Sequence, residues 1–327
     1  MVKKWHRLGN IAVVLIFIVA FGMGVQEPAG EQHYTQVSSE RVYVVPSGNI
    51  IGIRVDSGGA MVVDVPRRPL IGRNQIRIGD VITSVNGTEV RTVSEFEDAV
   101  RVSTNERVQV DLQRGDRALQ VEILPEVAVR DGQSGVGTLT YYDPATGRFG
   151  ALGHGVSDRD AGMLVPLDSG VIVQCTVTGL RRGEADEPGE LRGAFSVSAG
   201  QLGEIDRNDE NGIFGNMERR IVQGEAVPVA RADEVMEGEA VIISTVRGSG
   251  PQEFEIEIQK INERARDNRQ LEIQVTDEEL IEKTGGIVQG MSGSPILQNG
   301  MLVGAVTHVF TDEPLRGYGI LAEGMVE

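Results

Sequence analysis

Glycine is the residue that most restricts what this chain can fold into. It fills 42 of the 327 positions, whereas Phe, Trp and Tyr together make up only 4%. Glycines at this density interrupt helices and supply the turns between short strands. The length leaves room for about two domains of roughly 150 residues each. We therefore predict a mainly β protein with two folded domains.

Charge and cysteine content exclude several classes of function. A formal net charge of −17 argues against a nucleic-acid partner, because phosphate recognition needs a basic surface. Cys175 is the one cysteine, which excludes an internal disulfide and a cysteine-based zinc site. It lies on the apolar side of a predicted strand, and we interpret it as a small core residue. The histidines show no HExxH spacing, so we expect no metal and no cofactor.

The first 26 residues form a separate segment that predicts export or membrane attachment. Lys3, Lys4 and Arg7 precede an apolar run at residues 11–21. This order is typical of a signal peptide or of an uncleaved membrane anchor, and the sequence leaves that choice open. Because the basic end stays in the cytoplasm, the rest of the chain should be extracytoplasmic, either secreted or held by a single pass. Residues 27–44 have the composition of a polar tether.

Residues 45–125 carry the pattern of a small domain with a tight hairpin and one helix. Asn86-Gly87 is the pair that best tolerates the positive φ angles of a two-residue hairpin. Ser94 with Glu97 predicts a capping box at the start of the helix. At these residues the sequence resembles a PDZ domain.

The PDZ resemblance implies a peptide or protein ligand. In such folds an extended peptide adds as a strand to a sheet edge beside the helix, and a loop holds its terminal carboxylate. We assign this loop to residues 47–52 and expect Gly48, Ile51, Gly52 and Ile53 to contact the peptide. The alternative is a PDZ-shaped spacer that binds no ligand, because fold alone does not establish function.

A second domain is predicted at residues 136–327, after a polar linker at residues 126–135. Short runs of alternating apolar and polar residues, bounded by turn residues, favour a β-barrel or sandwich. The predicted strands cover residues 136–142, 148–152, 171–178, 240–246, 254–258 and 271–275.

The segment Gly290-Met291-Ser292-Gly293-Ser294 indicates a nucleophile loop. A serine that attacks an acyl group must be exposed on a tight loop whose main-chain N–H groups converge on the developing oxyanion. Ser292 is the predicted nucleophile, and the N–H groups of Gly290 and Ser292 are the predicted oxyanion hole. The run resembles the G-D-S-G-G-P loop of chymotrypsin-like peptidases, with Met291 in place of the acid.

His154 is the predicted general base for this serine. It stands in the run GALGHG, where glycines on both sides should expose the ring. His308 is the other histidine of this domain, but it falls inside an apolar strand next to Thr307. A histidine paired with a nucleophile loop follows the logic of a catalytic triad.

These two motifs together resemble the stage IV sporulation protein B peptidases of spore-forming bacteria. The resemblance covers nearly the whole chain, including the N-terminal segment and the PDZ domain. It implies an exported, chymotrypsin-like serine endopeptidase that cleaves itself and the extracytoplasmic part of a membrane regulator. Cleavage of that regulator would release an intramembrane metalloprotease in the forespore envelope and lead to sigma-factor processing. It also implies that Thr307 lies on the strand facing the substrate.

The third catalytic group has two candidates. The resemblance points to Asp277, which keeps the chain order His, Asp, Ser of chymotrypsin-like enzymes. Thr276 with Glu279 also predicts a capping box, so Asp277 could serve only to open a short helix. Asp158, four residues after His154, is the rival. We favour Asp277.

Two other functions use the same residues. The chain could be a PDZ-bearing extracytoplasmic binding protein with an inactive peptidase domain, in which residues 290–295 form only a turn. It could also hydrolyse another ester or amide, because the nucleophile and base would be the same.

Overall fold

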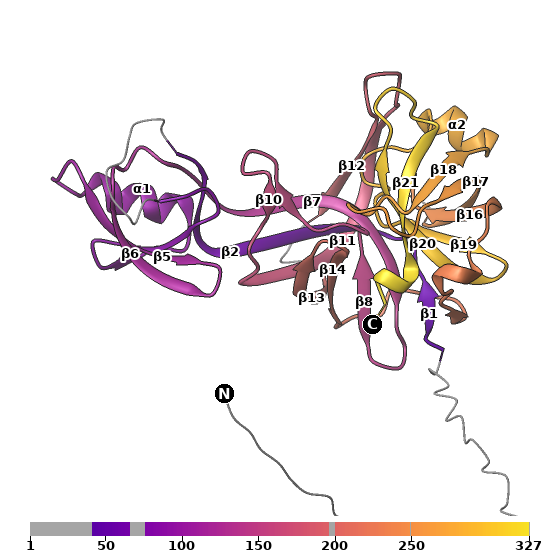
Figure 1. Ribbon diagram of the computed structural model, residues 1–327, viewed down its shortest axis with the longest axis horizontal. Coiled ribbons are helices and arrows are strands. Elements are labelled where there is room, and N and C mark those ends of the chain that lie inside the picture. The colour runs from indigo at the N-terminus through magenta and orange to yellow at the C-terminus, as the bar shows by residue number, and fades with distance from the viewer. Residues whose placement is uncertain (1–40, 66–75, 196–199, 249, 327) are drawn as a thin grey trace, which may run out of the picture. The chain divides into compact units, whose positions relative to one another are not determined.

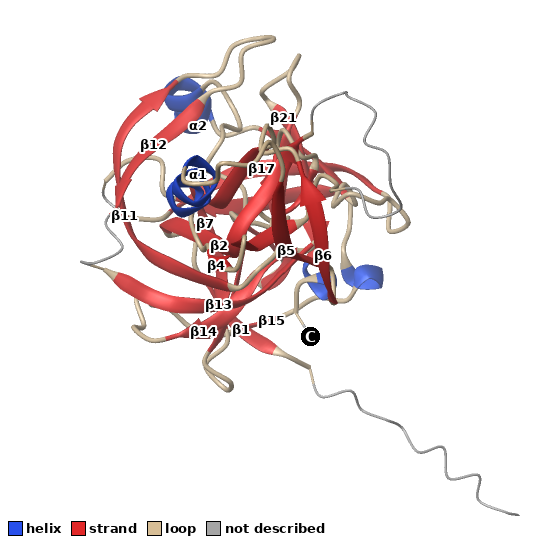
Figure 2. Ribbon diagram, turned by 90° about the vertical axis from the view of Figure 1, so that its left-hand side faces the viewer, coloured by secondary structure: helices blue, strands red, loops and turns tan. Residues whose placement is uncertain are grey.

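The computed structural model describes residues 41–65, 76–195, 200–248 and 250–326. The predicted membrane segment and residues 27–40 of the tether lie outside this part of the chain. Strands dominate what is described, as Figure 2 shows, and the mainly β prediction is confirmed. None of the helices found there has the length and apolar character needed to cross a membrane.

Six antiparallel strands close a barrel in the C-terminal part of the chain, drawn in orange and yellow in Figure 1. The strand at residues 252–261 shows why the sheet has one buried face. Phe254, Ile256 and Ile258 are buried, and the residues between them are exposed. Every second side chain therefore enters the barrel core. In barrel order the strands are β16 (Gly238–Ser244), β17 (Gln252–Ile261), β18 (Leu271–Val275), β21 (Arg316–Leu321), β20 (Met301–Val309) and β19 (Pro295–Gln298), and α2 (Glu278–Thr284) connects β18 to β19.

Six further antiparallel strands form a barrel that comes earlier in the chain. We call it the first barrel and the C-terminal one the second barrel. The first barrel closes because the last strand of its ring pairs with the first. Leu139, Phe149 and Ile172 are fully buried in its core. Two six-stranded antiparallel barrels agree with the predicted chymotrypsin-like architecture. In ring order the strands are β2 (Ile50–Asp64), β7 (Ala128–Tyr142), β8 (Arg148–Ala151), β14 (Gly212–Met217), β13 (Gln201–Asp209) and β11 (Ser169–Arg181), which returns to β2.

Short elements complete the barrels. Strand β12 pairs with β11, and β1 pairs with both β7 and β15. Their bounds are β1 (Tyr43–Pro46), β9 (Ser157–Asp158), β10 (Met163–Leu164), β12 (Glu190–Phe195) and β15 (Val227–Pro228), with 3-10 turns η1 (Ala232–Glu234) and η2 (Ala322–Gly324).

The PDZ-like domain is an insertion into the first barrel, between β2 and β7. Residues 50–56 of β2 pair with β7 and β11 inside the barrel, whereas residues 60–61 pair with β3 of the inserted domain. Figure 1 shows β2 and β7 as long neighbouring strands. The inserted elements are β3 (Val81–Val85), β4 (Thr88–Glu89), α1 (Val93–Arg101), β5 (Val108–Arg114) and β6 (Arg117–Ile123).

This topology corrects two predicted boundaries. Most of the predicted linker, residues 126–135, belongs to β7. The barrel assigned to residues 136–327 also requires residues 50–56, whose side chains Ile51, Ile53 and Val55 are buried in its core. A run of alternating apolar residues does not reveal which sheet it joins, and this is why the sequence assigned β2 to the PDZ domain alone.

Local turn signals in the inserted domain agree better with the structure. Asn86 and Gly87 both have positive φ angles, as the predicted hairpin requires. The helix is capped two residues earlier than predicted, because Thr92 accepts from the N–H of Glu95 and forms the capping box with that residue. Ser94 therefore lies within the first turn of α1.

The predicted peptide-binding loop is wrong in its location. Ile51 and Ile53 are buried in the first barrel, and Gly52 lies opposite Val136 on one side and Val173 on the other. Both edges of the strand are already paired, so a peptide cannot add there. Gly48, just before β2, donates its N–H to the carbonyl of Leu139 and is also part of the barrel.

Because the PDZ-like domain is an insertion, removing it should leave the barrels folded, whereas removing β2 should not. Asp56 and Gly132 are paired, so replacing residues 57–131 by Asn-Gly closes a two-residue hairpin. We expect this variant to melt cooperatively by circular dichroism, somewhat below the parent. The fragment 126–327 should not melt cooperatively, because it lacks the core side chains of Ile51, Ile53 and Val55. Loss of each one costs about 2–5 kcal/mol, whereas the total free energy of unfolding of a domain is about 5–15 kcal/mol.

The reverse result, a cooperative fragment and an unfolded deletion variant, would show that β2 is not part of the barrel.

Candidate active site

Gly153 lets the histidine loop of the first barrel approach the second barrel. After β8, Leu152 and Gly153 both take positive φ, 72° and 70°. A Cβ on Gly153 would lie 2.9 Å from Cγ2 of Thr307 in β20, so a larger residue would push the barrels apart. His154 follows this turn and therefore lies at the junction of the two barrels.

The serine loop makes the matching approach from the second barrel. Gly293 has a φ of 94°, and a Cβ there would lie 2.1 Å from the carbonyl oxygen of Thr138. Ser292 is half-buried, and its hydroxyl donates to the carbonyl of Thr307 at 2.8 Å. Met291 is fully buried, which explains why an apolar residue replaces the acid at this position.

Thr138 of β7 holds the serine loop in place, a role that residue spacing in the sequence does not reveal. Its N–H donates to the carbonyl of Ser292 at 2.9 Å, and its hydroxyl donates to the carbonyl of Gly290 at 2.8 Å. It is 1% exposed. In the sequence, Thr138 stands out only as a threonine among the apolar and small residues of a strand. Many threonines without a role in an active site occur in the same setting.

Two main-chain N–H groups of the serine loop are available to a substrate. The amides of Met291, Gly293 and Ser294 donate to main-chain carbonyls of the protein. Those of Gly290 and Ser292 donate to no acceptor in the described part of the chain. These are the two N–H groups predicted for the oxyanion hole, where donors must be preorganised and otherwise unoccupied.

His154 is held in the tautomer that a general base needs. Its Nδ1 lies 3.0 Å from the carbonyl oxygen of Gly155. A carbonyl only accepts, so in the neutral ring Nδ1 carries the hydrogen and Nε2 keeps its lone pair. Burial lowers the pKa of His154 below its ordinary 6.5, and the hydrogen bond to Gly155 offsets part of that change.

His308 lies against His154, a contact that the sequence did not predict. The two ring centroids are 5.3 Å apart, with the planes tilted by 34°. His308 is exposed as a whole residue, but loss of water around its ring, followed by the like charges of His154 and Arg269, lowers its pKa to about 4, while Asp267 opposes this. His308 is therefore neutral near pH 7 and adds no positive charge beside His154.

Neither candidate acid makes a hydrogen bond or ion pair with His154. Asp277 is the N-cap of α2 and accepts from the N–H of Leu280 at 2.8 Å. The predicted helix is present, but Asp277 caps it in place of Thr276, which the predicted capping box had put at this position. Asp158 is fully buried and accepts from Arg130 at 2.8 Å and Gln133 at 2.6 Å.

The environment of Asp158 is that of a structural ion pair. Burial would raise the pKa of this carboxyl, but the N–H of Ala161 and the guanidinium of Arg130 lower it more. Asp158 therefore fastens the segment after His154 to β7. The assignment of Asp277 to the triad has no supporting contact in the structure and stays a prediction.

Thr307 lies beside the nucleophile, and the expectation that its strand faces the substrate stays a prediction. Its carbonyl accepts from Ser292, and its buried hydroxyl donates to the carbonyl of Asn268 at 2.8 Å. Asn268 in turn donates to the carbonyl of Glu210 in the turn after β13. These bonds connect the strand beside Ser292 to both barrels.

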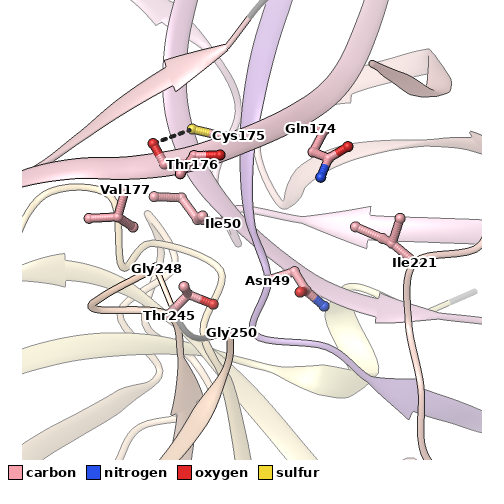
Figure 3. Close-up of a pocket in the computed structure, with 10 residues that line it drawn as sticks. All are labelled: Asn49, Ile50, Gln174, Cys175, Thr176, Val177, Ile221, Thr245, Gly248 and Gly250. Atoms are coloured by element: carbon pink, nitrogen blue, oxygen red, sulfur yellow. Dashed lines mark hydrogen bonds between the residues drawn. The ribbon is translucent and has the colours of Figure 1, made fainter. Parts of the chain in front are cut away.

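The free cysteine is one of the residues that line a cavity of about 220 Å³ elsewhere in the structure (Figure 3). Burial raises the pKa of the Cys175 thiol, and its sulfur points to the carbonyl of Thr176 at 4.0 Å. A protonated thiol is a poor nucleophile, so Cys175 does not compete with Ser292 for a catalytic role. No group of three or more His, Cys, Asp or Glu side chains within the described ranges could hold a metal ion.

The lowered pKa of His154 predicts the pH dependence of turnover. A general base must be neutral, so kcat/KM falls as pH drops through its pKa. We expect this acid limb below pH 6.5, measured with a chromogenic peptide substrate. His308→Asn should leave the limb in place, because the pKa of His308 is already about 4. A limb above 6.5, or one that vanishes in that variant, would contradict the assignment.

The two aspartates should differ in what they do for stability. Asp158→Asn removes a buried charge from its partners and should lower Tm by about 3–10 °C. Asp277→Asn should change Tm by no more than about 2 °C, because Asn caps helices as well as Asp. From the contacts, turnover of Asp277→Asn should remain near normal. A loss approaching 10,000-fold in a folded protein would instead give Asp277 the triad role.

Comparison with known proteins identifies the family of this chain. Residues 126–326 match the model of the SpoIVB peptidase S55 family, and residues 48–124 match that of a PDZ domain. A search of curated proteins found no match.

Two solved structures of Rv3671c in an inactive form are similar to this chain. One is a serine-to-alanine mutant from M. tuberculosis H37Rv, with 13% identity over 58% of this chain and 79% of that one, and a TM-score of 0.32. The other, of the Rv3671c protease, has 14% identity over 58% and 80%, and a TM-score of 0.31. Because the peptidase model matches more than half of the chain, this protein belongs to the SpoIVB peptidase S55 family of serine peptidases and carries a PDZ domain.

Proposed function

We propose that this protein is an exported serine endopeptidase of sporulation signalling. It cleaves itself and the extracytoplasmic part of a membrane regulator, which activates an intramembrane metalloprotease and sigma-factor processing. Membership of the peptidase family supports this proposal, as does the basic and apolar pattern of residues 1–26. That pattern favours a protein that works outside the cytoplasm, either secreted or held by a single pass. The proposed sporulation role would put it in the space between the forespore membranes.

The observation that carries the proposed chemistry is the pair of unoccupied N–H groups beside the Ser292 hydroxyl. A substrate carbonyl placed there accepts from Gly290 and Ser292 while Ser292 Oγ attacks its carbon. Nε2 of His154 takes the hydroxyl proton and then passes it to the leaving amine. Water then attacks the acyl-enzyme, again with His154 as the base, and releases the product acid.

One rearrangement precedes this chemistry. The Ser292 hydroxyl donates to Thr307 and makes no hydrogen bond with His154. Rotation of the serine side chain about its Cα–Cβ bond breaks one hydrogen bond and frees Oγ to donate to His154. Such bonds are often formed only in the substrate complex. Gly155 supplies the orienting acceptor that an aspartate supplies in other triads.

Labelling by a fluorophosphonate tests the nucleophile. We expect the wild-type protein to be labelled and Ser292→Ala to give no signal. Ser294→Ala is the matched control: its hydroxyl is fully buried and has no hydrogen-bond partner, so alanine should keep labelling and cost little stability. Equal labelling of the two variants would remove Ser292 from the role.

The signalling role is tested separately with purified protein. Incubation of the full-length chain should produce self-cleavage products by mass spectrometry, and Ser292→Ala should produce none. Added extracytoplasmic domain of the membrane regulator from the same organism should be cut at a discrete site. A labelled protein that cuts neither itself nor the regulator would limit the conclusion to a serine hydrolase. Absence of labelling would favour the binding protein with an inactive peptidase domain.

A further inference from the structure

The turn between β17 and β18, residues 262–270, is tied to the strand beside the nucleophile. The carbonyl of the buried Asn268 accepts from the hydroxyl of Thr307 at 2.8 Å, and the carbonyl of Thr307 accepts from Ser292. At the base of the turn, Asn262 donates its N–H to the carbonyl of Gln270 at 2.7 Å. The β17–β18 turn therefore belongs to the surroundings of the active site.

The backbone that precedes Arg269 has an uncommon and fixed conformation. Asp267 and Asn268 both lie in the left-handed region, with φ angles of 60° and 58°. Residues other than glycine seldom adopt this conformation, and Asn and Asp tolerate it best. The side chain of Asn268 also donates to the carbonyl of Glu210, which holds the turn from a second direction. The direction of the chain at Arg269 is therefore set by these bonds.

A row of side-chain contacts leads from Arg269 to the catalytic histidine. The guanidinium carbon of Arg269 lies 5.0 Å from the ring centroid of Tyr318 in β21. Tyr318 is paired with His308, so their side chains share one face of the sheet. The ring centroid of His308 lies 5.3 Å from that of His154. Three contacts of this kind span roughly 15 Å, which an extended substrate covers with about four residues.

Arg269 is a cation without an acidic partner. It is exposed and makes no ion pair with any residue in the described ranges. The acid opposite Tyr318 in β18 is Glu272, which is already paired with Lys260 and Arg316 at 3.3 Å each. A guanidinium that lies over a ring keeps its N–H edge free, and that edge matches a carboxylate.

Positive charge outweighs negative charge on this side of the active site. After loss of water around the ring and the charge of His154, the charge of Arg269 lowers the pKa of His308 more than Asp267 raises it. The whole chain has a net charge of −17, so its average field repels acidic peptides. An acidic residue of a substrate is therefore favoured locally, at Arg269.

We propose, resting on the peptidase function proposed above, that Arg269 selects substrates with an Asp or Glu within about four residues of the scissile bond. The carboxylate accepts from the free N–H edge of Arg269. A neighbouring apolar side chain of the substrate covers Tyr318 and Phe310, whose ring centroids are 4.5 Å apart. A Lys or Arg at the same place in the substrate meets a like charge and is disfavoured. The preferred substrate is thus an acidic peptide segment.

Digestion of a peptide library tests this preference. The full-length protein cleaves an equimolar set of tetradecapeptides of varied sequence, and mass spectrometry locates the cuts. Acetylated and amidated ends leave side chains as the only carboxylates. We expect Asp and Glu to be enriched about 3-fold or more within four residues of the cuts, as for an exposed ion pair. Arg269→Glu should move the enrichment to Lys and Arg.

A matched pair of substrates separates charge recognition from a structural role. The acidic peptide that is cut best is compared with its amide version, in which Asn or Gln replaces the acid. We expect kcat/KM to favour the acid about 3- to 5-fold in the wild type and to be equal within about 1.5-fold in Arg269→Gln. Arg264→Gln is the control, since Arg264 is an exposed arginine of the same turn without the contact to Tyr318, and it should keep the wild-type ratio.

Fluorophosphonate labelling of each variant distinguishes the possible failures. An unlabelled wild type would refute the peptidase function and this inference with it. A labelled wild type without acidic preference, or an unchanged ratio in Arg269→Gln, would overturn the role of Arg269 alone. An equal loss of preference in Arg264→Gln would do the same. Loss of labelling in Arg269→Gln would show that this arginine supports the nucleophile loop and does not select the substrate.

Discussion

The ladder between β2 and β7 is the interaction on which the rest of the described structure depends. It closes the first barrel through pairs such as Ile53 with Gly135, and it forms part of the inserted domain through pairs such as Val62 with Val129. One set of main-chain hydrogen bonds therefore serves two cores. The PDZ domain is not attached by a flexible linker, and neither core is complete if one of the two strands is removed.

The active site depends in turn on close contact between the barrels. Gly153 and Gly293 leave out a side chain where each loop meets the other barrel, and Thr138 binds two carbonyls of the serine loop. These contacts hold the loop in a shape that leaves the amides of Gly290 and Ser292 unused. Polar groups of β7 thus bind the carbonyls of the loop, and two N–H donors of the loop stay available to a substrate.

The sequence predicted features that depend on local chemistry and missed those that depend on topology. The glycine frame of Ser292, the Asn86-Gly87 turn and the helix opened by Asp277 each have a short-range physical signal, and all three are present. The path of β2 has no such signal, because the same alternation suits a strand in either sheet. The contacts of Thr138, and the pairing of Asp158 with Arg130, join distant parts of the chain and could not be inferred from spacing.

The continuity of β7 also fixes the distance between the inserted domain and the serine loop. Val129, which pairs with Val62 in the inserted domain, and Thr138, which holds the Ser292 carbonyl, lie nine positions apart on one strand. An extended strand advances about 3.4 Å per residue, so the two positions are separated by no more than roughly 30 Å. Because a single strand spans this distance without a loop, the inserted domain and the serine loop cannot move independently of each other.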